Sequence, residues 1–497
     1  MVQPRTYLAI DLGAESGRAI LGAFDGERLT LSEVHRFSNG PVRLPDGLHW
    51  DVLRLWSEIK DSLARAAHGD QPPVSIGLDT WGVDFALLDR HGVLLSNPYH
   101  YRDNRTDTML VEAFKRVPRE QIFDHTGIQF MSINTLYQLL SMVVAHSPVL
   151  DLADRFLTIP DLFNYWLTGQ QVCEFSNATT TQCYDPRRRD WALPLLAALD
   201  IPQHIFPRVI ASGTPLGSLH PIVAGDTRAS HVQVIAPACH DTGSAVAAVP
   251  SENEHFAWIS SGTWSIMGTN VPEPIINAAS LASNFTNEGG VGGLYRFSKN
   301  IQALWLVQES RRTWAANGQS FTYAELTELA AQAEPFTAII DPDHIDFLKP
   351  GDMPERIRAY CERTGQHVPD HHGAIVRCAL ESLALKYRWV LENIEEMIGY
   401  HLEPIHIIGG GTQNRLLNQF TADATNRSVV AGPIEATALG NILMQAVALG
   451  DIGSLSDARA IVRQSFTPNV FEPKSSTGWD EAYRRLLALS SQEQRNA

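Results

Sequence analysis

Lysine is scarce in this sequence, and its placement excludes one large class of nucleotide-binding proteins. None of the six lysines follows a glycine, so the chain has no Gly-Lys-Ser/Thr phosphate loop. The chain also lacks a Gly-x-Gly-x-x-Gly motif behind its first predicted strand, a Gly-x-Ser-x-Gly elbow and a His-Glu-x-x-His pair. These absences argue against a Walker-type ATPase, a dinucleotide-dependent dehydrogenase, a serine hydrolase and a zinc protease.

Long apolar runs are missing as well, and cysteine is rare. No run approaches the roughly 18 residues that a membrane span needs, and a strand-like segment begins by Tyr7 without the pattern of a signal peptide. The chain has no Cys-x-x-Cys pair, which argues against a zinc site and a secreted disulfide framework. Its five cysteines are Cys173, Cys183, Cys239, Cys361 and Cys378, of which the last two could still pair. We expect a cytoplasmic protein with no membrane partner.

A basic surface is the third feature that the sequence lacks. The formal net charge is −16, and the one short arginine run, residues 187–189, reads as a solvated loop. A nucleic-acid partner is therefore not expected, because phosphate backbones demand a basic face. An acidic chain can still bind a phosphorylated ligand where backbone amides, an arginine and a metal ion act locally.

A faint internal repeat indicates how the chain is divided. Residues 7–22 read as strand, small polar turn and strand, and residues 256–267 repeat this order. The chain has 497 residues, 44% of them hydrophobic, which is enough for two large cores. We therefore predict two similarly built lobes, residues 1–250 and 251–497, with the boundary near Pro250.

Three turns of small residues follow predicted strands, at residues 13–18, 260–263 and 409–414. Small residues let backbone N–H groups approach phosphate oxygens, and side chains such as Ser16 and Thr263 could add donors. One such turn is ordinary in an α/β protein. Three in order, split between two lobes, favour a nucleotide site.

A polar triplet, His240-Asp241-Thr242, stands almost at the midpoint of the chain. It follows the apolar run 232–236, which reads as a short buried strand. In open α/β sheets, ligands bind beyond the carboxyl ends of strands. The alternative interpretation is that Asp241 merely caps a helix that begins near Ala245.

Taken together, these residues resemble the FGGY carbohydrate kinases. The Asp-x-Gly…Ser-x-Arg turn at residues 11–18 is similar to that family's first phosphate motif, residues 260–263 to its second, and residues 409–411 to its adenosine motif. Residues 433–440 resemble its C-terminal signature, and the likeness extends from residue 7 to about residue 450. The resemblance implies an α/β, two-lobed actin/hexokinase-like ATPase fold, with ribonuclease H-like lobes and the active site in the interlobe cleft.

Within the family, the resemblance is closest to the members that phosphorylate L-rhamnulose. The strings that carry it occupy residues 11–18, 79–85, 101–103, 127–130, 177–182, 240–242, 260–265 and 286–290. This implies ATP-dependent phosphorylation of the C1 hydroxyl of a ketose, from L-rhamnulose to L-rhamnulose 1-phosphate, in L-rhamnose catabolism. The expected partners are the ketose and MgATP, and no nucleic acid.

The resemblance also implies roles for individual residues. Asp241 would be the base that receives the proton of the sugar hydroxyl. Residues 1–250 would form a sugar-binding lobe with this base and the first phosphate turn, and residues 251–497 a nucleotide-binding lobe. The sugar contacts would be Gly82, His240, Asp241, Thr242 and Asn300. The ATP contacts would be Ala14, Glu15, Ser16, Gly17, Arg18, Thr263, Gln308 and Gly410. Asp11 would hold Mg²⁺ through water.

Several of these residues have a purely structural alternative. Gly82 could simply permit a tight turn, and Asp11 could cap its own turn. Asn300 precedes residues 301–314, whose spacing predicts a helix, so it also reads as the N-cap of that helix. Gln308 would then lie about 12 Å farther along the same helix.

The substrate and the function class keep alternatives too. L-Fuculose, ribulose or xylulose could replace L-rhamnulose, since one small group in an apolar pocket is worth only about 1–3 kcal/mol. Trp81, Phe85 and Phe130 are candidates for the apolar wall that such a pocket needs, or for ordinary core residues. In another class, the fold could serve as a non-catalytic actin-like nucleotide-binding scaffold, against which Asp241 argues. The oligomeric state stays open.

Overall fold

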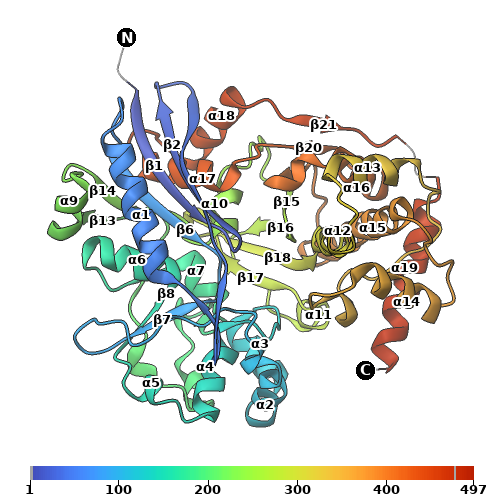
Figure 1. The fold of residues 1–497 in the computed structure, drawn as a ribbon, viewed down its shortest axis with the longest axis horizontal. Helices are drawn as coiled ribbons and strands as arrows, with labels where there is room; N and C mark the ends of the chain where they lie inside the picture. The colour runs from blue at the N-terminus through green and yellow to red at the C-terminus, as the bar shows by residue number, and fades with distance from the viewer. Residues whose placement is uncertain (1–3, 475–476, 497) are drawn as a thin grey trace. The chain divides into compact units, whose positions relative to one another are not determined.

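The first hairpin forms as residues 7–22 predict. Strand β1 (Arg5–Leu12) pairs antiparallel with β2 (Ser16–Phe24), and the Gly13 N–H donates to the Ser16 carbonyl at 2.9 Å to close the turn. Every residue of β1 after Arg5 is buried, because the strand lies inside a sheet. The computed structural model describes residues 4–474 and 477–496 (Figure 1).

Within these residues the chain forms two compact units. Unit 1 takes in Met1–Glu252, Asn270–Phe297 and Glu435–Phe466, and unit 2 takes in Asn253–Thr269, Ser298–Ile434 and Thr467–Ala497. The first division lies two residues from the boundary that the sequence predicts, and unit 1 also contains two later segments. The last of them joins unit 1 because helix α17 (Ala436–Ala448) packs on β1, on β6 (Ser75–Thr80) and on α10 (Asp241–Ala247).

Unit 1 is built on a six-stranded sheet with the order β13-β14-β6-β1-β2-β3. The hairpin strands β1 and β2 continue antiparallel into β3, whereas β6 lies parallel to β1, and β14 parallel to β6. The remaining strands of this sheet are β3 (Leu29–Ser38), β13 (Thr214–Ser218) and β14 (Gln233–Ala236). The carboxyl ends of the parallel strands β1, β6 and β14 therefore meet at one edge.

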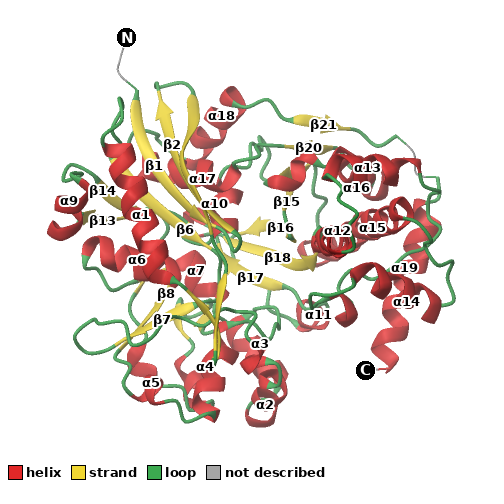
Figure 2. Ribbon diagram, in the orientation of Figure 1, coloured by secondary structure: helices red, strands yellow, loops and turns green. Residues whose placement is uncertain are grey.

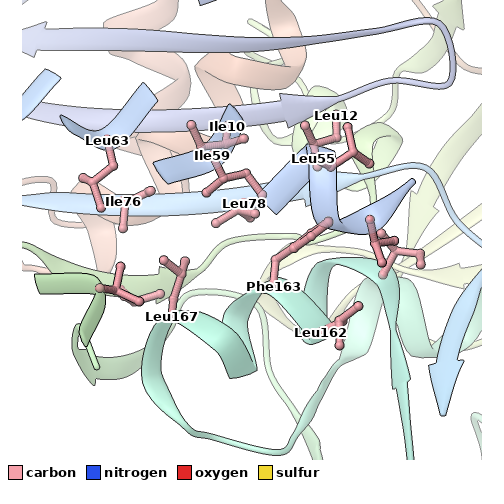
Figure 3. Close-up of a cluster of buried hydrophobic side chains, with 14 of the residues drawn as sticks. Ile10, Leu12, Leu55, Ile59, Leu63, Ile76, Leu78, Leu162, Phe163 and Leu167 are labelled. Atoms are coloured by element: carbon pink, nitrogen blue, oxygen red, sulfur yellow. The ribbon is translucent and has the colours of Figure 1, made fainter. Parts of the chain in front are cut away.

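Helices cover both faces of this sheet (Figure 2). On one face, α1 (Val52–Ala67) and α6 (Ile159–Thr168) bury their apolar side chains against alternate residues of β1 and β6, as Figure 3 shows. On the other face, α17 lies so close that a Cβ at Gly77 would meet the side chain of Asn441 at 2.4 Å. This alternation is the two-residue period of a strand that is covered on both sides.

Smaller elements of unit 1 surround this frame. Its short strands are β4 (Pro41–Leu44), β5 (Gly47–Trp50), β7 (Phe85–Leu88), β8 (Arg155–Thr158), β9 (Cys173–Glu174), β10 (Tyr184–Asp185), β11 (Asp190–Trp191), β12 (Val209–Ile210) and β17 (Thr286–Gly289). Its other α-helices are α2 (Met109–Arg116), α3 (Arg119–Thr126), α4 (Thr135–Val144), α5 (Pro148–Asp151), α7 (Phe175–Thr180), α8 (Leu193–Ala198), α9 (Pro221–Thr227), α11 (Ala278–Ala282) and α18 (Leu455–Ser465).

Unit 2 repeats the arrangement of unit 1. Its strands follow the order β18-β16-β15-β19-β20-β21, in which β15 and β16 form an antiparallel hairpin, and β19 and β20 lie parallel to β15. The predicted repeat of residues 7–22 in residues 256–267 thus corresponds to the same kind of antiparallel hairpin in each of the two sheets. These strands are β15 (Ala257–Ser261), β16 (Trp264–Val271), β18 (Tyr295–Gln302), β19 (Ile405–Ile408), β20 (Val429–Ala431) and β21 (Asn469–Phe471). Residues 270–271 of β16 and 295–297 of β18 belong to the segments of unit 1.

The helices of unit 2 include the longest one that the structure describes, α15, with 27 residues. It packs against α13, α16 and α19. The helices are α12 (Trp305–Ala316), α13 (Tyr323–Gln332), α14 (Met353–Arg363), α15 (His372–Ile398), α16 (Arg415–Thr425) and α19 (Trp479–Asn496). In the described part of the chain, no helix combines the length and the apolar character that crossing a lipid bilayer requires.

Candidate active site

The polar triplet lies directly beyond the carboxyl end of β14, where α10 begins. Helix α10 starts at Asp241 itself, with His240 as its N-cap residue. Asp241 therefore does not cap a helix that begins near Ala245, and this alternative is wrong. Instead, its Oδ1 atom accepts hydrogen bonds from the backbone N–H of Thr242 at 2.5 Å and from the Thr242 hydroxyl at 3.2 Å. One third of the Asp241 side chain stays exposed, so the carboxylate is reachable by a ligand.

A buried carboxylate holds the backbone that leads into this helix. Glu174 is fully buried and accepts hydrogen bonds from the Cys239 N–H at 2.9 Å and from the hydroxyls of Ser176 and Ser212. The Ser176 hydroxyl oxygen in turn accepts the His240 N–H at 3.0 Å. Hydrogen bonds to a charged acceptor are stronger than neutral ones. The turn that carries Asp241 is thereby fixed before any ligand arrives.

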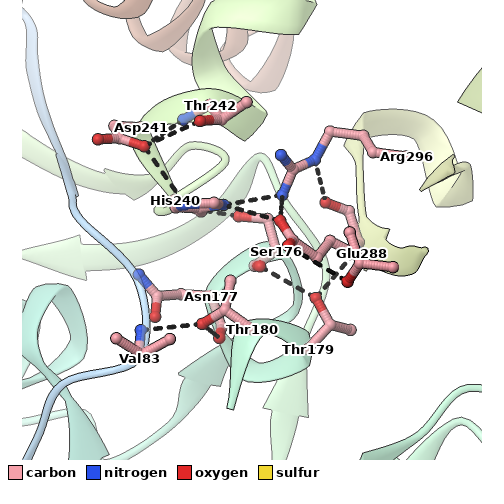
Figure 4. A network of polar contacts seen from close by, with 12 residues as sticks. Val83, Ser176, Asn177, Thr179, Thr180, His240, Asp241, Thr242, Glu288 and Arg296 are labelled. Atoms are coloured by element: carbon pink, nitrogen blue, oxygen red, sulfur yellow. Dashed lines mark hydrogen bonds and ion pairs between the residues drawn. The ribbon is translucent and has the colours of Figure 1, made fainter. Parts of the chain in front are cut away.

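His240 lies between two acidic side chains and an arginine, as Figure 4 shows. Its Nε2 atom is 3.3 Å from Asp241 Oδ1, and its Nδ1 atom is 2.8 Å from Arg296 Nη2 and 3.4 Å from Glu288 Oε2. Arg296 is completely buried and also donates to Glu288 Oε2 at 3.0 Å. Burial raises the pKa of Glu288, but the positive charge of Arg296 is the main opposing effect, and this pKa stays at about 2.

The low pKa of Glu288 predicts how one part of the stability depends on pH. Because the folded state binds this proton more weakly than the unfolded chain, Glu288 stabilises the fold fully above about pH 5 and loses this effect as the pH falls from about 4.5 towards 2. We expect Glu288→Gln to lower the free energy of unfolding by roughly 1–3 kcal/mol at pH 7. Urea unfolding of both proteins from pH 7 to pH 3 should show this difference shrinking; a difference that is the same at every pH would contradict the assignment.

The first phosphate turn brings together a second charged cluster in unit 1. Arg18 forms ion pairs with Asp11 Oδ2 at 2.5 Å and with Glu435. Burial raises the pKa of Asp11, although Arg18 opposes this, and burial together with the charge of Asp11 raises the pKa of Asp79 well above its usual range. The charge of Asp241 adds to both shifts. Carboxylates thus outnumber the one arginine at this position.

These carboxylates fit the requirements of a magnesium site that is completed by phosphate and water. Asp79 is fully buried; its Oδ2 accepts a hydrogen bond from Asn441 at 2.6 Å, while its Oδ1 has no hydrogen-bond partner. A divalent cation beside Asp11 would relieve the repulsion between the carboxylates. Within residues 4–474 and 477–496, no group of three or more His, Cys, Asp or Glu side chains could hold a metal alone. Mg²⁺ usually keeps several waters and binds through few protein carboxylates.

The two turns of small residues at 260–263 and 409–414 lie against each other in unit 2. A Cβ at Gly411 would come within 2.0 Å of the Ser261 hydroxyl, so only glycine permits this approach. The Thr263 carbonyl accepts the backbone N–H of Trp305 at 3.1 Å, which places the start of α12 beside the second turn. A cavity of about 970 Å³ opens here, and Gly262, Gln308 and Gly410 line it.

The lining of this cavity suits a nucleotide. Apolar side chains such as Leu304, Val307 and Val376 can pack against a base, and the cationic side chains Arg415 and Lys474 can approach phosphate oxygens. The volume falls in the range of sites for ligands of this size. Neither Arg415 nor Lys474 belongs to a recognisable sequence motif, and only the fold brings them to this wall.

Asn300 corrects the predicted start of one helix. It lies in strand β18, and α12 begins only at Trp305, so Asn300 is not the N-cap of a helix over residues 301–314. The ladder beside β16 extends the strand through Ile301 and Gln302, and this tertiary pairing overrides the local helical spacing. Gln308 therefore lies in a different element from Asn300, and the predicted 12 Å separation along one helix is wrong.

The sequence-predicted residues fall into two groups. Unit 1 contains Asp11, Ala14, Glu15, Ser16, Gly17, Arg18, Gly82, His240, Asp241 and Thr242, and unit 2 contains Thr263, Asn300, Gln308 and Gly410. Gly82 is a position of close approach, since a Cβ there would lie 3.0 Å from the Thr180 hydroxyl.

Sequence reasoning missed the charged partners of these residues. Glu288 and Glu435 stand inside strings that resemble family motifs, so their position carried a signal that could have pointed to them. Arg296 stands outside every such string. Arg296 belongs to the site because its side chain contacts His240, which lies 56 residues earlier in the sequence.

Sequence comparisons with known proteins identify the family of this chain. Residues 6–248 match the N-terminal domain, and residues 257–449 the C-terminal domain, of the FGGY family of carbohydrate kinases. The chain is 43% identical over 479 residues to the rhamnulokinase of Bacteroides thetaiotaomicron, which covers 96% of this chain and 98% of that protein. It is 39% identical over 491 residues to the rhamnulokinase of Pectobacterium atrosepticum, with 98% and 97% covered.

Solved structures show the same fold at low sequence identity. The gluconate kinase from Lactobacillus acidophilus superposes with a TM-score of 0.81 at 16% identity, covering 98% of both chains. The glycerol kinase of Plasmodium falciparum, solved with ADP, gives a TM-score of 0.79 at 16% identity, covering 99% of this chain and 98% of that one. The prediction of an α/β, actin/hexokinase-like ATPase fold is confirmed, and ATP is the co-substrate that the family uses. The chain belongs to the FGGY family of carbohydrate kinases.

Proposed function

We propose that this protein transfers the γ-phosphoryl group of ATP to the C1 hydroxyl of L-rhamnulose and yields L-rhamnulose 1-phosphate in L-rhamnose catabolism. The observation that carries this proposal is identity over almost the whole chain, 43% and 39%, to two proteins named rhamnulokinase. We include a cytoplasmic location in the proposal. The five cysteines support it, because all are buried thiols without a disulfide, as is usual in a reducing compartment.

Asp241 acts as the general base in this proposal. Its partly exposed carboxylate is fixed by Thr242 and by the backbone of α10. It accepts the proton of the sugar hydroxyl as the new P–O bond forms and the bond from the γ-phosphorus to the departing ADP breaks. Phosphoryl transfer passes through a loose transition state, so positioning and charge neutralisation supply most of the acceleration. His240, Thr242, Gly82 and Asn300 orient the sugar.

The nucleotide contacts complete this proposal. Residues 14–18 offer the amides of the first phosphate turn, and the other nucleotide contacts are Thr263, Gln308 and Gly410. Asp11 would hold Mg²⁺ through water, and the ion would supply charge neutralisation at the transferring phosphoryl group. Arg18 is paired with Asp11 and Glu435 in this structure, and it also reaches the phosphate oxygens in the proposed complex.

Trp81 and Phe85 differ in how well each suits the apolar wall of a sugar pocket. Phe85 stacks on Phe156 with 5.1 Å between ring centroids, as a core residue does. Trp81 is 6% exposed, packs on Trp50 at 3.9 Å and donates its indole N–H to Asp84 at 3.0 Å. Because it is rigid and adjoins Gly82, Trp81 is the better candidate for a wall against the methyl group of rhamnulose.

A ketose panel tests the proposal directly. We expect kcat/KM for L-rhamnulose to exceed the values for L-ribulose and L-xylulose by about 10- to 200-fold, because these pentuloses lack the methyl group that an apolar pocket would bind. L-Fuculose keeps this methyl group and differs in the configuration of one hydroxyl, so its ratio tests the polar contacts of the sugar. ADP release measured with MgATP and each sugar gives these ratios, and release without sugar is the control. A higher kcat/KM for any of the other ketoses would reassign the substrate, and no sugar-dependent release would overturn the kinase proposal.

A further inference from the structure

Arg296 approaches His240 in a way that determines where the imidazole carries its proton. The Arg296 Nη2 atom lies 2.8 Å from His240 Nδ1, and the arginine side chain is completely buried. A guanidinium group donates hydrogen bonds and cannot accept one. His240 Nδ1 must therefore be the acceptor, with its lone pair directed at Arg296.

Nε2, the second ring nitrogen, must then carry the proton. A neutral imidazole carries one N–H, so with Nδ1 as acceptor the proton is on Nε2. Nε2 is 3.3 Å from Asp241 Oδ1, so its N–H lies within ion-pair distance of that carboxylate. A doubly protonated ring does not fit, because its Nδ1–H would face the N–H of Arg296 at 2.8 Å.

Glu288 determines which nitrogen of His240 would carry the proton if Arg296 were replaced. Its Oε2 atom accepts from Arg296 at 3.0 Å and lies 3.4 Å from His240 Nδ1. With Arg296 present, the shorter contact to His240 belongs to the arginine. If the guanidinium were removed, Glu288 would be the remaining charged partner of Nδ1, and a carboxylate can only accept. The proton would then move to Nδ1, and Nε2 would stop donating to Asp241.

We propose that Arg296 is a positioning residue: it holds His240 as the Nε2–H tautomer, and His240 in turn holds one oxygen of Asp241 so that the other faces the sugar hydroxyl. The last step rests on the proposed function, since it takes Asp241 as the base. The first step concerns the folded protein alone. Nitrogen NMR can observe it without any turnover.

The test uses full-length protein with ¹⁵N-labelled histidine. We expect the wild-type spectrum to show His240 with a bare Nδ1 and a protonated Nε2, and the signals are assigned by their loss in His240→Gln. Arg296→Met should reverse the two nitrogens and lower kcat about tenfold, with KM for ATP unchanged. Arg296→Lys keeps a donor at the same place, and it should restore the wild-type tautomer and most of kcat.

The outcomes separate this inference from the proposed function. A protonated Nδ1 in the wild-type protein overturns the inference, even if neither Arg296 variant folds. A reversed tautomer in Arg296→Met with unchanged kcat overturns the link to Asp241. If L-rhamnulose is not phosphorylated at all, the proposed function fails, whereas the tautomer in the spectrum still decides the first step.

Discussion

Asp241→Asn should lower kcat for sugar phosphorylation by about 10²- to 10⁴-fold, the range that general base catalysis supplies. Asparagine has the same shape, and its Oδ1 can still accept from the Thr242 N–H, so the start of α10 should persist. It cannot take up the proton of the hydroxyl. The residual rate should remain measurable, because positioning and charge neutralisation contribute independently in a loose transition state.

Nucleotide binding separates this effect from damage to the fold. The cavity beside Gln308 and Gly410 is built from unit 2 alone, so calorimetric titration of Asp241→Asn with ATP should give an affinity within about threefold of wild type. Asp226→Asn is a matched control, because Asp226 is an exposed carboxylate of unit 1 that pairs only with Lys60 in the described contacts. This control should keep wild-type turnover. Wild-type kcat in Asp241→Asn would remove Asp241 from the role of base.

The sequence predicts those parts of this fold that depend on neighbouring residues. The two hairpins at residues 7–22 and 256–267 and the strand before the turn at residues 409–414 all form, because apolar strands and small-residue turns are local patterns. Asn300 shows the limit of this reasoning. Its flanking residues have helical spacing, but the neighbouring strand β16 keeps them in a ladder that no local pattern reveals.

The candidate site also contains some residues that local sequence patterns reveal and others that only the tertiary fold brings together. Asp241 could be identified from the triplet and the family resemblance, since its motif is contiguous. The environment of Asp241 could not, because Arg296 and Glu288 reach His240 from β18 and β17, far along the chain. Likewise, Arg18 pairs with Glu435, which lies 417 residues later in the sequence. Contacts of this kind follow from the tertiary fold and leave no periodicity in the sequence.

The C-terminal signature, residues 433–440, gains a physical role from its last glycine. Gly440 lies on α17, where a Cβ would stand 1.8 Å from the backbone oxygen of Ser244 on α10. No rotamer change can relieve a clash between a Cβ and a backbone carbonyl, so the two helices would have to move apart. Because α10 begins with Asp241, this movement would also displace the proposed base.

Gly440→Ala should therefore lower both stability and activity. Overpacking of this kind costs about 3 kcal/mol in the free energy of unfolding, and a displacement of about 1 Å at the base lowers kcat about 10²-fold. Urea unfolding and ADP release measure the two effects. Gly225→Ala is the matched control, since Gly225 also lies in a helix of unit 1, α9, but its Cβ would meet nothing within 4 Å. That variant should be as stable as wild type or slightly more so, because alanine favours a helix. If Gly440→Ala matched Gly225→Ala in both measurements, the close packing of α17 on α10 would not be what holds Asp241 in place.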